Sequence, residues 1–348
     1  MKNVISVQAS ILEGLQQLCR LTEQDTFTLF VIDSEQKVLG SLTDGDLRRH
    51  LASGGSLGDS ITKAMHDRFY YVRTEQELFE AAQQLRQDKI QLVPKLDAEG
   101  RLVRVYDLVH LKAYLPVDAV IMAGGRGERL RPLTDTTPKP LLPLGNKAIM
   151  EYNVDKIASM GIDNITVCIR YLGEQIKDFF GDGSSRGVRM RYITEEQPLG
   201  TLGAVTLIHH FEHDVVLVMN SDLFTSINLE DFYLHFIKSG ADMSVAATPY
   251  NISVPYAVMQ TQEDKVLAFE EKPTYTYYSN AGIYLIRRSL LETLTRGERY
   301  DTTDLMERTL QQGGKLTYFP IVGYWLDIGT PEEYQKAKDI IRYLNHTS

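Results

Sequence analysis

The sequence has few cysteines and no long apolar stretch. Among its 348 residues only Cys19 and Cys168 are cysteines, which excludes a disulfide scaffold and a cysteine-ligated metal cluster. No stretch approaches the roughly 18 consecutive apolar residues of a membrane-spanning helix. Residues Met1–Ser10 lack a basic segment followed by an apolar run, so we expect no signal peptide. These absences predict a cytoplasmic protein that does not act at a membrane.

Positive charge is also scarce. The chain has 37 Lys and Arg against 46 Asp and Glu, a net charge of −9, which argues against a nucleic-acid-binding protein. The hydrophobic share of 43% and the charged share of 24% are ordinary for a folded protein and exclude a disordered chain. A phosphate-binding site in such a chain must therefore depend on a few well-placed cations and a metal ion.

The length is sufficient for about two domains, and Pro116 marks a boundary between them. The ring of Pro116 disfavours helix at Leu115, and a new apolar pattern begins at Val117. We therefore predict one domain at residues 1–115 and a second at residues 117–348.

The first part contains an internal repeat. The pattern of Ser10–Leu18 recurs at Glu77–Leu85, and Asp33 in the first copy aligns with Asp97 in the second. Each copy is predicted to contain an amphipathic helix, a strand, a turn, a second strand and a final helix. Two such small α/β units would stabilise each other by stacking.

This repeat resembles a tandem pair of cystathionine-β-synthase (CBS) regulatory modules. The resemblance rests on the order of the elements and on the segment Gly40–Arg48 (GSLTDGDLR). It implies a site for an adenine nucleotide in which Thr43 and Asp46 hold the ribose. The corresponding residues of the second copy are Asp107 and His110, so at most one such site is expected. A module used only for packing or dimerisation is an equally open interpretation.

The second part alternates predicted strands and helices. The strands are Ala119–Met122, Asn164–Ile169, Val188–Ile193 and Val215–Met219, and the helices are Met150–Met160, Gly173–Phe179, Thr201–His209 and the terminal Pro331–Tyr343. Such alternation is typical of a largely parallel, doubly wound sheet. Later strands with fewer helices between them indicate an antiparallel or mixed extension, namely Met243–Thr248, Ala257–Gln260, Val266–Glu270 and Gly282–Ile286.

A glycine-rich loop follows the first strand of the second part. Gly124, Gly125 and Gly127 allow backbone N–H groups to approach an anion without a Cβ in the way. Arg129 and Lys139 add positive charge beside them. The loop lacks the third glycine of a dinucleotide-binding motif and the Gly-Lys-Ser/Thr of a Walker loop. Its composition and its place after a buried strand predict a site for a polyphosphate.

With the residues around it, this loop resembles the signature of sugar-1-phosphate nucleotidylyltransferases, the enzymes that make nucleotide sugars. The signature segment is Ala123–Thr134 (AGGRGERLRPLT), followed by Pro138–Leu141 (PKPL). Further blocks follow in the family's order, namely Gln197–Gly203 (QPLGTLG), Asn220–Asp222 (NSD), Phe269–Pro273 (FEEKP), Asn280–Tyr284 (NAGIY) and Tyr324–Pro331 (YWLDIGTP). The resemblance covers essentially the whole second part. It implies a Rossmann-like, mixed-sheet (GT-A-like) nucleotidyltransferase domain after the CBS pair.

The resemblance also implies a reaction between a nucleoside triphosphate and a sugar 1-phosphate, with Mg²⁺ as cofactor and no nucleophilic side chain. The implied catalytic cations are Arg129, Lys139 and Lys272; the nucleotide-binding residues are Gly124, Gly125, Gly127, Pro198, Gly200, Thr201 and Asp222; the sugar-binding residues are Tyr256, Glu271, Lys272, Asn280 and Gly282; the Mg²⁺ ligands are Asp222 and Asp327. Glu128, Leu202 and Ala257 depart from the family pattern, which leaves the identity of the sugar open. We expect Glu128 to face solvent.

Two segments are most similar to the guanylyltransferase branch, whose members act on mannose, heptose or glucosamine 1-phosphate: Thr137–Leu144 (TPKPLLPL) and Pro198–Thr201 (PLGT). A CBS pair before such a domain resembles the enzymes that supply GDP-glucosamine for bacterial nonulosonic acids, which belong to cell-surface glycans. We therefore expect GTP and glucosamine 1-phosphate as substrates and, by analogy, a homo-oligomer. Thymidylyl or uridylyl transfer is an alternative, and so is a CBS-based nucleotide sensor whose transferase site is inert.

Overall fold

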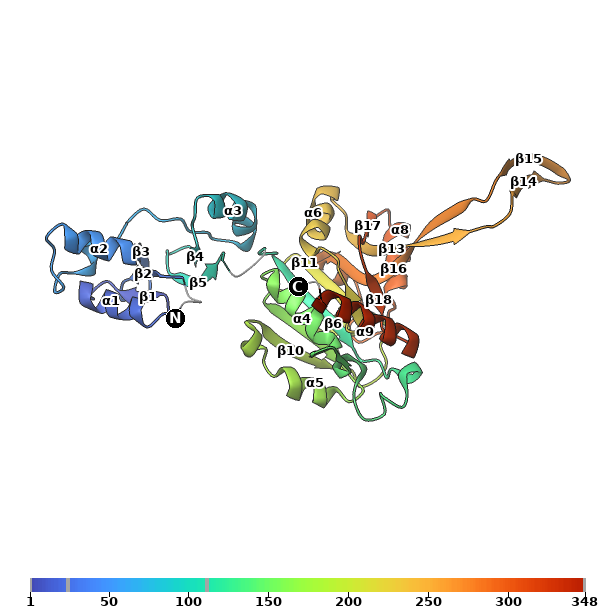
Figure 1. Ribbon diagram of the computed structural model, residues 1–348, viewed down its shortest axis with the longest axis horizontal. Helices are drawn as coiled ribbons and strands as arrows, with labels where there is room; N and C mark the ends of the chain where they lie inside the picture. Colours follow the sequence, from blue (N-terminus) through green and yellow to red (C-terminus); the bar gives the residue numbers. More distant parts are fainter. Residues whose placement is uncertain (1, 23–25, 110–112, 347–348) are drawn as a thin grey trace. The chain divides into compact units, whose positions relative to one another are not determined.

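The computed structural model describes residues 2–22, 26–109 and 113–346 (Figure 1). The chain divides into two compact units, Met1–Leu115 and Pro116–Ser348. Across these described ranges, every helix is too short or too polar to cross a membrane.

The first unit contains β1 (Val4–Ser6), α1 (Ile11–Cys19), β2 (Thr28–Ile32), β3 (Val38–Thr43), α2 (Asp44–Ala52), a 3-10 turn (Ile61–Lys63), α3 (Glu75–Gln87), β4 (Leu92–Leu96) and β5 (Leu102–Asp107). β2 runs parallel to β1 and antiparallel to β3, and β4 pairs antiparallel with β5. The predicted order of helix, strand, turn and strand is confirmed in both copies, and α2 is the predicted final helix of the first copy. The final helix expected for the second copy lies around residues 110–115; residues 110–112 lie outside the described residues, and the described residues 113–115 form no helix.

The two copies have separate cores that are joined by backbone hydrogen bonds. Leu29 is fully buried in the core of the first copy, and Leu78 is fully buried in the core of the second. The backbone N–H of Val38 donates to the carbonyl of Gly100 at 3.1 Å. The repeat therefore builds one unit from two small α/β halves.

The second unit contains β6 (Val117–Ala123), β7 (Pro143–Leu144), β8 (Lys147–Ala148), α4 (Ile149–Ser159), β9 (Asn164–Ile169), α5 (Gly173–Phe180), β10 (Arg189–Thr194), β11 (Val215–Asn220), β12 (Leu223–Thr225), α6 (Leu229–Ser239), β13 (Met243–Ser253), β14 (Val258–Gln262), β15 (Lys265–Glu270), β16 (Thr274–Arg287), α7 (Arg288–Leu291), α8 (Thr302–Gln311), β17 (Leu316–Pro320), β18 (Trp325–Asp327) and α9 (Pro331–His346). Short 3-10 turns lie at Glu128–Leu130, Lys139–Leu141, Ser184–Arg186 and Gly203–Leu207.

A mixed sheet forms the centre of this unit, with its described strands in the order β10-β9-β6-β11-β16-β13-β17. β10, β9, β6 and β11 are parallel, β16 is antiparallel to both of its neighbours, and β17 is parallel to β13. β9 is buried along its whole length, as expected for a parallel strand covered on both faces. The predicted mixed α/β fold with a largely parallel sheet is therefore confirmed.

The predicted helix at Thr201–His209 is wrong, because this stretch forms only the 3-10 turn Gly203–Leu207. The backbone N–H of Gly203 donates to the carbonyl of Tyr300 at 3.1 Å, so the segment is tied to the loop before α8. The hydroxyl of Thr206 donates to the carbonyl of Gly203 at 2.7 Å and competes for an acceptor that a helix would use. These tertiary and side-chain bonds outweigh the helical spacing of the apolar residues.

β12 and β18 pair antiparallel, with Leu223 opposite Asp327. The backbone N–H of Ile328 donates to the carbonyl of Asp222 at 3.1 Å. This pairing brings two distant parts of the chain together and places Asp222 beside the strand that ends in Asp327.

Residues 254–273, called the arm below, extend from the ends of β13 and β16 and contain the hairpin β14–β15. In Figure 1 the arm projects away from the sheet of its own unit. β15 is exposed along its whole length, and in β14 only Val258 is partly buried. The arm therefore buries little of its surface within the described part of its own unit.

Candidate active site

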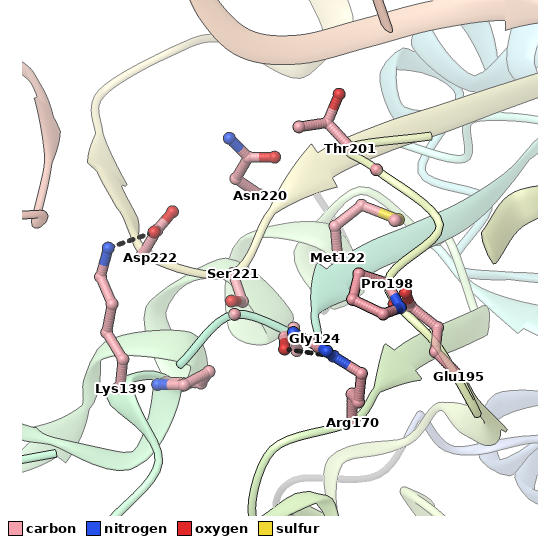
Figure 2. Close-up of a pocket in the computed structure, with 14 residues that line it drawn as sticks. Met122, Gly124, Lys139, Arg170, Glu195, Pro198, Thr201, Asn220, Ser221 and Asp222 are labelled. Atoms are coloured by element: carbon pink, nitrogen blue, oxygen red, sulfur yellow. Dashed lines mark hydrogen bonds and ion pairs between the residues drawn. The ribbon is translucent and has the colours of Figure 1, made fainter. Parts of the chain in front are cut away.

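A cavity of about 260 Å³ opens at the carboxyl ends of the parallel strands (Figure 2). Gly124 and Gly125 follow β6, Arg170 follows β9, Glu195 follows β10, and Asn220 ends β11; all of them line the cavity. The loops after parallel strands converge at this edge, which is where open α/β sheets bind their ligands. The predicted glycine loop is thus part of a real cavity.

Close approaches require the glycines of this loop. A Cβ on Gly124 would lie 2.7 Å from Oε1 of Glu195. Gly127 has a φ of +63°, and a Cβ there would lie 2.9 Å from the methyl carbon of Thr134. The Thr134 hydroxyl donates to the carbonyl of Gly127 at 2.8 Å. Gly127 therefore shapes the loop from outside the cavity, whereas Gly124 and Gly125 form part of its wall.

The segment predicted to surround the base and ribose also lines the cavity, through Pro198, Gly200 and Thr201. Gly200 has a φ of +81°, and a Cβ there would lie 2.5 Å from the carbonyl oxygen of Tyr300. The backbone N–H of Thr201 donates to Oδ1 of Asp301 at 3.0 Å. The loop before α8 therefore fixes this wall in place.

Lys139 joins the two aspartates that the sequence predicts as metal ligands. Its Nζ forms a hydrogen-bonded ion pair with Oδ2 of Asp222, shown in Figure 2, and lies 3.7 Å from Oδ1 of Asp327. The Lys139 side chain is 11% exposed, so its positive charge is largely shielded from solvent. The structure thus brings together a cation and two carboxylates from three separate motifs.

These two carboxylates suit a divalent cation. The Oδ1 atoms of Asp222 and Asp327 are buried and, among the described atoms, accept no hydrogen bond. Burial raises the pKa of Asp327, and the neighbouring negative charge of Asp222 raises it further. One lysine compensates two carboxylates only in part, and Mg²⁺ commonly binds one or two carboxylates plus phosphate oxygens. No cluster of three or more His, Cys, Asp or Glu side chains suited to a metal occurs in the described ranges.

Arg129 lies at this acidic end of the site and not in the cavity wall. A Cβ on Gly329 would lie 2.9 Å from a guanidinium nitrogen of Arg129, which places that group against the turn after β18. The positive charge of Arg129 also lowers the pKa of Asp327, against the larger effects of burial and Asp222. Glu128, as expected, is exposed.

Sequence reasoning missed Glu195 and Arg170. Glu195 is only 6% exposed, and its Oε2 accepts a hydrogen bond from the backbone N–H of Leu199 at 3.1 Å. Burial raises the pKa of Glu195, and the hydrogen bond from Leu199 and the charge of Arg170 offset this in part. Arg170 also donates to the carbonyl of Gly124 at 3.4 Å (Figure 2). Both residues follow a parallel strand directly, which is the signal that could have revealed them.

The residues predicted to bind the sugar divide into two groups. Gly282 lies beside Asn220, since a Cβ on Gly282 would lie 2.7 Å from the Asn220 amide nitrogen. The Asn280 side chain accepts a hydrogen bond from the backbone N–H of Gly282 at 2.9 Å, so it lies at the same end of the sheet. The others, Tyr256, Glu271 and Lys272, lie on the exposed arm, and the structure does not bring them to the cavity of their own chain.

Comparison with known proteins decides the family of the second unit. Residues 118–342 match the model of the nucleotidyl transferase family, described as "Nucleotidyl transferase". The chain belongs to this family. The match begins just after the first unit ends at Leu115 and includes every cavity residue named above.

Relatives of this nucleotidyl transferase act on different sugars and bases, according to their names. The chain is 31% identical over 233 residues to a mannose-1-phosphate guanylyltransferase of Mycobacterium tuberculosis, covering 65% of each chain. It is 29% identical to a D-glycero-alpha-D-manno-heptose 1-phosphate guanylyltransferase of Aneurinibacillus thermoaerophilus, covering 66% of this chain and all of that one. A solved structure described as a putative glucose-1-phosphate thymidylyltransferase of Bacillus anthracis, in complex with a sucrose, is 28% identical. It aligns with a TM-score of 0.53 over 65% of this chain and 95% of that one.

The first unit lies outside the family match, so its resemblance to a CBS pair stays a prediction. Its two expected ribose ligands form the N-terminal cap of α2. The Thr43 hydroxyl donates to Oδ2 of Asp46 at 2.6 Å, and the Asp46 backbone N–H donates to that hydroxyl at 3.3 Å. The Oδ1 of Asp46 pairs with Arg49 and lies 2.8 Å from Nε2 of His66. Helix capping therefore accounts for both side chains without a nucleotide.

Asp46→Ala is expected to destabilise the first unit by about 2 kcal/mol, because it removes a helix cap and leaves Arg49 and His66 without their buried partner. Burial alone would raise the pKa of Asp46, but hydrogen bonds from Thr43 and His66 outweigh it and hold the pKa below its usual range. The charged form is therefore the stabilising one, and its contribution is lost as the pH falls below about 4. Chemical unfolding of wild type and variant at neutral and acidic pH measures both effects.

Asp44→Ala is the matched control, because the ion pair of Asp44 is with the exposed Arg48 on the same helix. It should change stability by no more than about 0.5 kcal/mol. Equal losses in the two variants would contradict a capping role for Asp46.

Proposed function

We propose that the protein transfers a nucleotidyl group from a nucleoside triphosphate, GTP by preference, to a sugar 1-phosphate. The products are a nucleotide sugar and pyrophosphate. The observation that carries this proposal is the convergence of the glycine loop, Lys139 and the pair Asp222 and Asp327 on one edge of the sheet. The family match and the names of the relatives support the same reaction class.

The reaction requires positioning and charge compensation, and no protein nucleophile. A phosphate oxygen of the sugar 1-phosphate attacks the α-phosphorus in line, and the bond from that phosphorus to the β-phosphate oxygen breaks with its electron pair. Backbone N–H groups of Gly124 and Gly125 are suited to the triphosphate, and Lys139 and Arg129 to the charge that develops on it. Asp222 and Asp327 would hold Mg²⁺, which compensates negative charge on the phosphate oxygens.

The preference for GTP is supported by Glu195, a buried carboxylate in the cavity wall next to Gly124. Guanine presents two adjacent donors on its pairing edge, N1–H and the N2 amino group, and a carboxylate accepts both. Uracil and thymine present one N–H between two carbonyl oxygens, which a carboxylate repels. A buried, negatively charged acceptor at this position therefore favours guanine over either pyrimidine.

Glucosamine 1-phosphate is the sugar we propose, for a nucleotide sugar used in bacterial cell-surface glycans such as nonulosonic acids. This part of the proposal depends on the resemblance of the two-part chain described above. The named relatives act on mannose and heptose phosphates, so these sugars belong in any test.

Pyrophosphate release from GTP, UTP and dTTP, each with glucosamine, mannose and heptose 1-phosphates and Mg²⁺, tests the proposal directly. The expected result is the highest kcat/KM for GTP with glucosamine 1-phosphate. A clear preference for UTP or dTTP would overturn the guanylyl assignment but leave the reaction class intact. No release from any pair would overturn the reaction class.

Glu195→Gln is expected to lower kcat/KM for GTP about 30-fold, or about 2 kcal/mol, because one of two charged acceptors becomes an N–H donor. The rates with UTP and dTTP should rise or stay constant, since an amide suits their pairing edges. Steady-state kinetics with all three nucleotides measures this change in selectivity.

Glu196→Gln is the control for this variant, because Glu196 is the next residue and is exposed. It should leave the selectivity unchanged.

In the wild type, GTP affinity should weaken as the pH falls and Glu195 becomes protonated. Because burial raises the pKa of Glu195, this weakening should begin at a higher pH than it would for an exposed glutamate. An unaltered preference for GTP in Glu195→Gln would show that other groups recognise the base.

A further inference from the structure

The arm holds two residues that the resemblance to sugar-1-phosphate nucleotidylyltransferases assigns to the sugar, and holds them away from the cavity. Glu271 and Lys272 directly follow β15 and are exposed. Within the described ranges neither side chain makes a hydrogen bond or an ion pair. The residues that line the cavity come instead from the sheet and from the loops after β6, β9, β10 and β11. One chain therefore brings Asn280 and Gly282 to the end of the sheet where the cavity lies, but not Glu271 and Lys272.

We propose that two copies of this chain exchange their arms, so that Glu271 and Lys272 of each copy complete the active site of the other. The inference deepens the proposed function and rests on it, since it takes Glu271 and Lys272 to bind the sugar 1-phosphate of that reaction. Each complete active site then contains residues of both copies and exists only in the dimer.

The surface of the arm is that of an interface. Tyr256 is 75% exposed, Met259 is 62% exposed, Leu267 is 63% exposed and Phe269 is 73% exposed. Met259 and Phe269 are cross-strand partners, so their side chains lie side by side on one face. A two-stranded hairpin alone is marginally stable in water, and contiguous exposed apolar surface on a folded protein marks a contact with another surface.

Exposed tyrosines also lie on the strands near the base of the arm. Tyr250 on β13, Tyr277 and Tyr278 on β16 and Tyr318 on β17 are all about half exposed or more. The rings of Tyr278 and Tyr318 pack with their centroids 4.8 Å apart. Exposed apolar and aromatic side chains thus occur both on the arm and on the strands next to its base.

The arm is stiff where it leaves the sheet, which disfavours closure onto its own cavity. The ladder between β13 and β16 continues as far as the pair Ser253 and Thr274. It is extended by a hydrogen bond of 3.0 Å from the Val254 backbone N–H to the Pro273 carbonyl. Folding the arm back onto the cavity of its own chain would break these outer pairs. A second chain can bind the arm in its extended position without breaking them.

A second copy of this chain is the partner that fits both the arm and the cavity. Every copy has one cavity that lacks Glu271 and Lys272 and one arm that carries them, so a twofold exchange fills both sites and leaves no arm over. A different protein would leave the cavity of each copy incomplete. The backbone of Lys272 has a φ of +45° directly before a buried Pro273, a strained conformation of the kind that functional sites retain.

Complementation in a mixed dimer tests this exchange. Lys272→Ala and Asp222→Asn chains are co-expressed with different affinity tags, and the doubly tagged dimer is purified. If arms are exchanged, one of its two sites contains both intact residues, so the dimer should retain about half the wild-type rate of pyrophosphate release. If each arm serves its own chain, both sites are defective and the rate should fall to that of the single variants. That result would overturn the proposal, and so would failure to recover a doubly tagged dimer.

The control is the mixed dimer of Lys265→Ala with Asp222→Asn, because Lys265 lies on the arm away from the sugar-binding pair. It should give about half the wild-type rate under either arrangement and so calibrates the measurement. A wild type that releases no pyrophosphate would overturn the proposed function instead.

A second measurement is independent of activity. Phe269→Glu should shift the protein from dimer to monomer in analytical ultracentrifugation, because it places a charge in the exchanged surface. Leu234→Glu, on α6 and 47% exposed, should leave the dimer unchanged. An unchanged dimer dissociation constant in Phe269→Glu would overturn arm exchange whatever the activity of the wild type.

Discussion

Asp222→Asn is expected to lower kcat about a thousandfold while much of the GTP affinity persists. Asp222 and Asp327 lie on either side of Lys139, and each has a buried oxygen without a hydrogen bond among the described atoms. The amide removes one of the two negative charges that would hold Mg²⁺, but it leaves the glycine loop and the wall around Pro198 unchanged. Pyrophosphate release measures kcat, and calorimetric titration with GTP measures the remaining affinity.

Asp214→Asn is the matched control, because Asp214 precedes β11 whereas Asp222 follows that strand. Its side chain is 80% exposed and pairs with Arg288 on the surface. The control should turn over at the wild-type rate. If Asp222→Asn does so as well in the presence of Mg²⁺, the assignment of Asp222 to the metal is wrong.

Lys139→Met is expected to lower kcat about 100-fold or more, because it removes a cation placed to compensate charge on the transferred phosphate. It should also destabilise the free protein by about 1–3 kcal/mol, since two half-buried carboxylates lose their shared partner. Added Mg²⁺ should recover more stability in this variant than in the wild type, because the ion then provides the missing positive charge. Pyrophosphate release and thermal unfolding with and without Mg²⁺ measure these effects.

Lys177→Met provides the comparison, since Lys177 on α5 pairs with the exposed Glu174 on the surface of the same unit. It should leave both kcat and the response to Mg²⁺ unchanged. A Lys139→Met variant with native turnover would show that Lys139 serves only to hold the two carboxylates together.

The strands of the central sheet were predictable because parallel strands covered on both faces are continuous apolar runs. The predicted strand Asn164–Ile169 has the same bounds as β9, and the predicted strand Val215–Met219 differs from β11 by one residue. The functional edge followed from the same pattern, because Gly124 and Asp222 stand just after two of these runs. This part of the site required no knowledge of tertiary contacts.

Other features depend on contacts between distant segments. The helix predicted at Thr201–His209 failed because Gly203 bonds to Tyr300, almost a hundred residues later in the chain. Glu195 carries no motif of its own, and it becomes distinctive only because Leu199 and Gly124 enclose it. Local periodicity contains no information about such partners.

The family blocks were all visible in the sequence, but their assembly was not. The sequence predicted that Lys272 and Lys139 serve one site, whereas the fold places Lys139 between two carboxylates and Lys272 on a projecting arm. Tertiary structure decides this because the direction of the arm depends on the ladder between β13 and β16.

By itself the sequence determined the alternation of strands and helices, the division near Pro116 and the residues predicted to bind phosphate. These follow from apolar periodicity, proline geometry and residue type, which act over a few neighbouring positions. Only the tertiary structure decided that Asp222 and Asp327 share Lys139, that Glu195 is enclosed beside Gly124, and that the arm leaves its own cavity. Each of these depends on burial and on long-range pairing, which arise only when distant segments pack together.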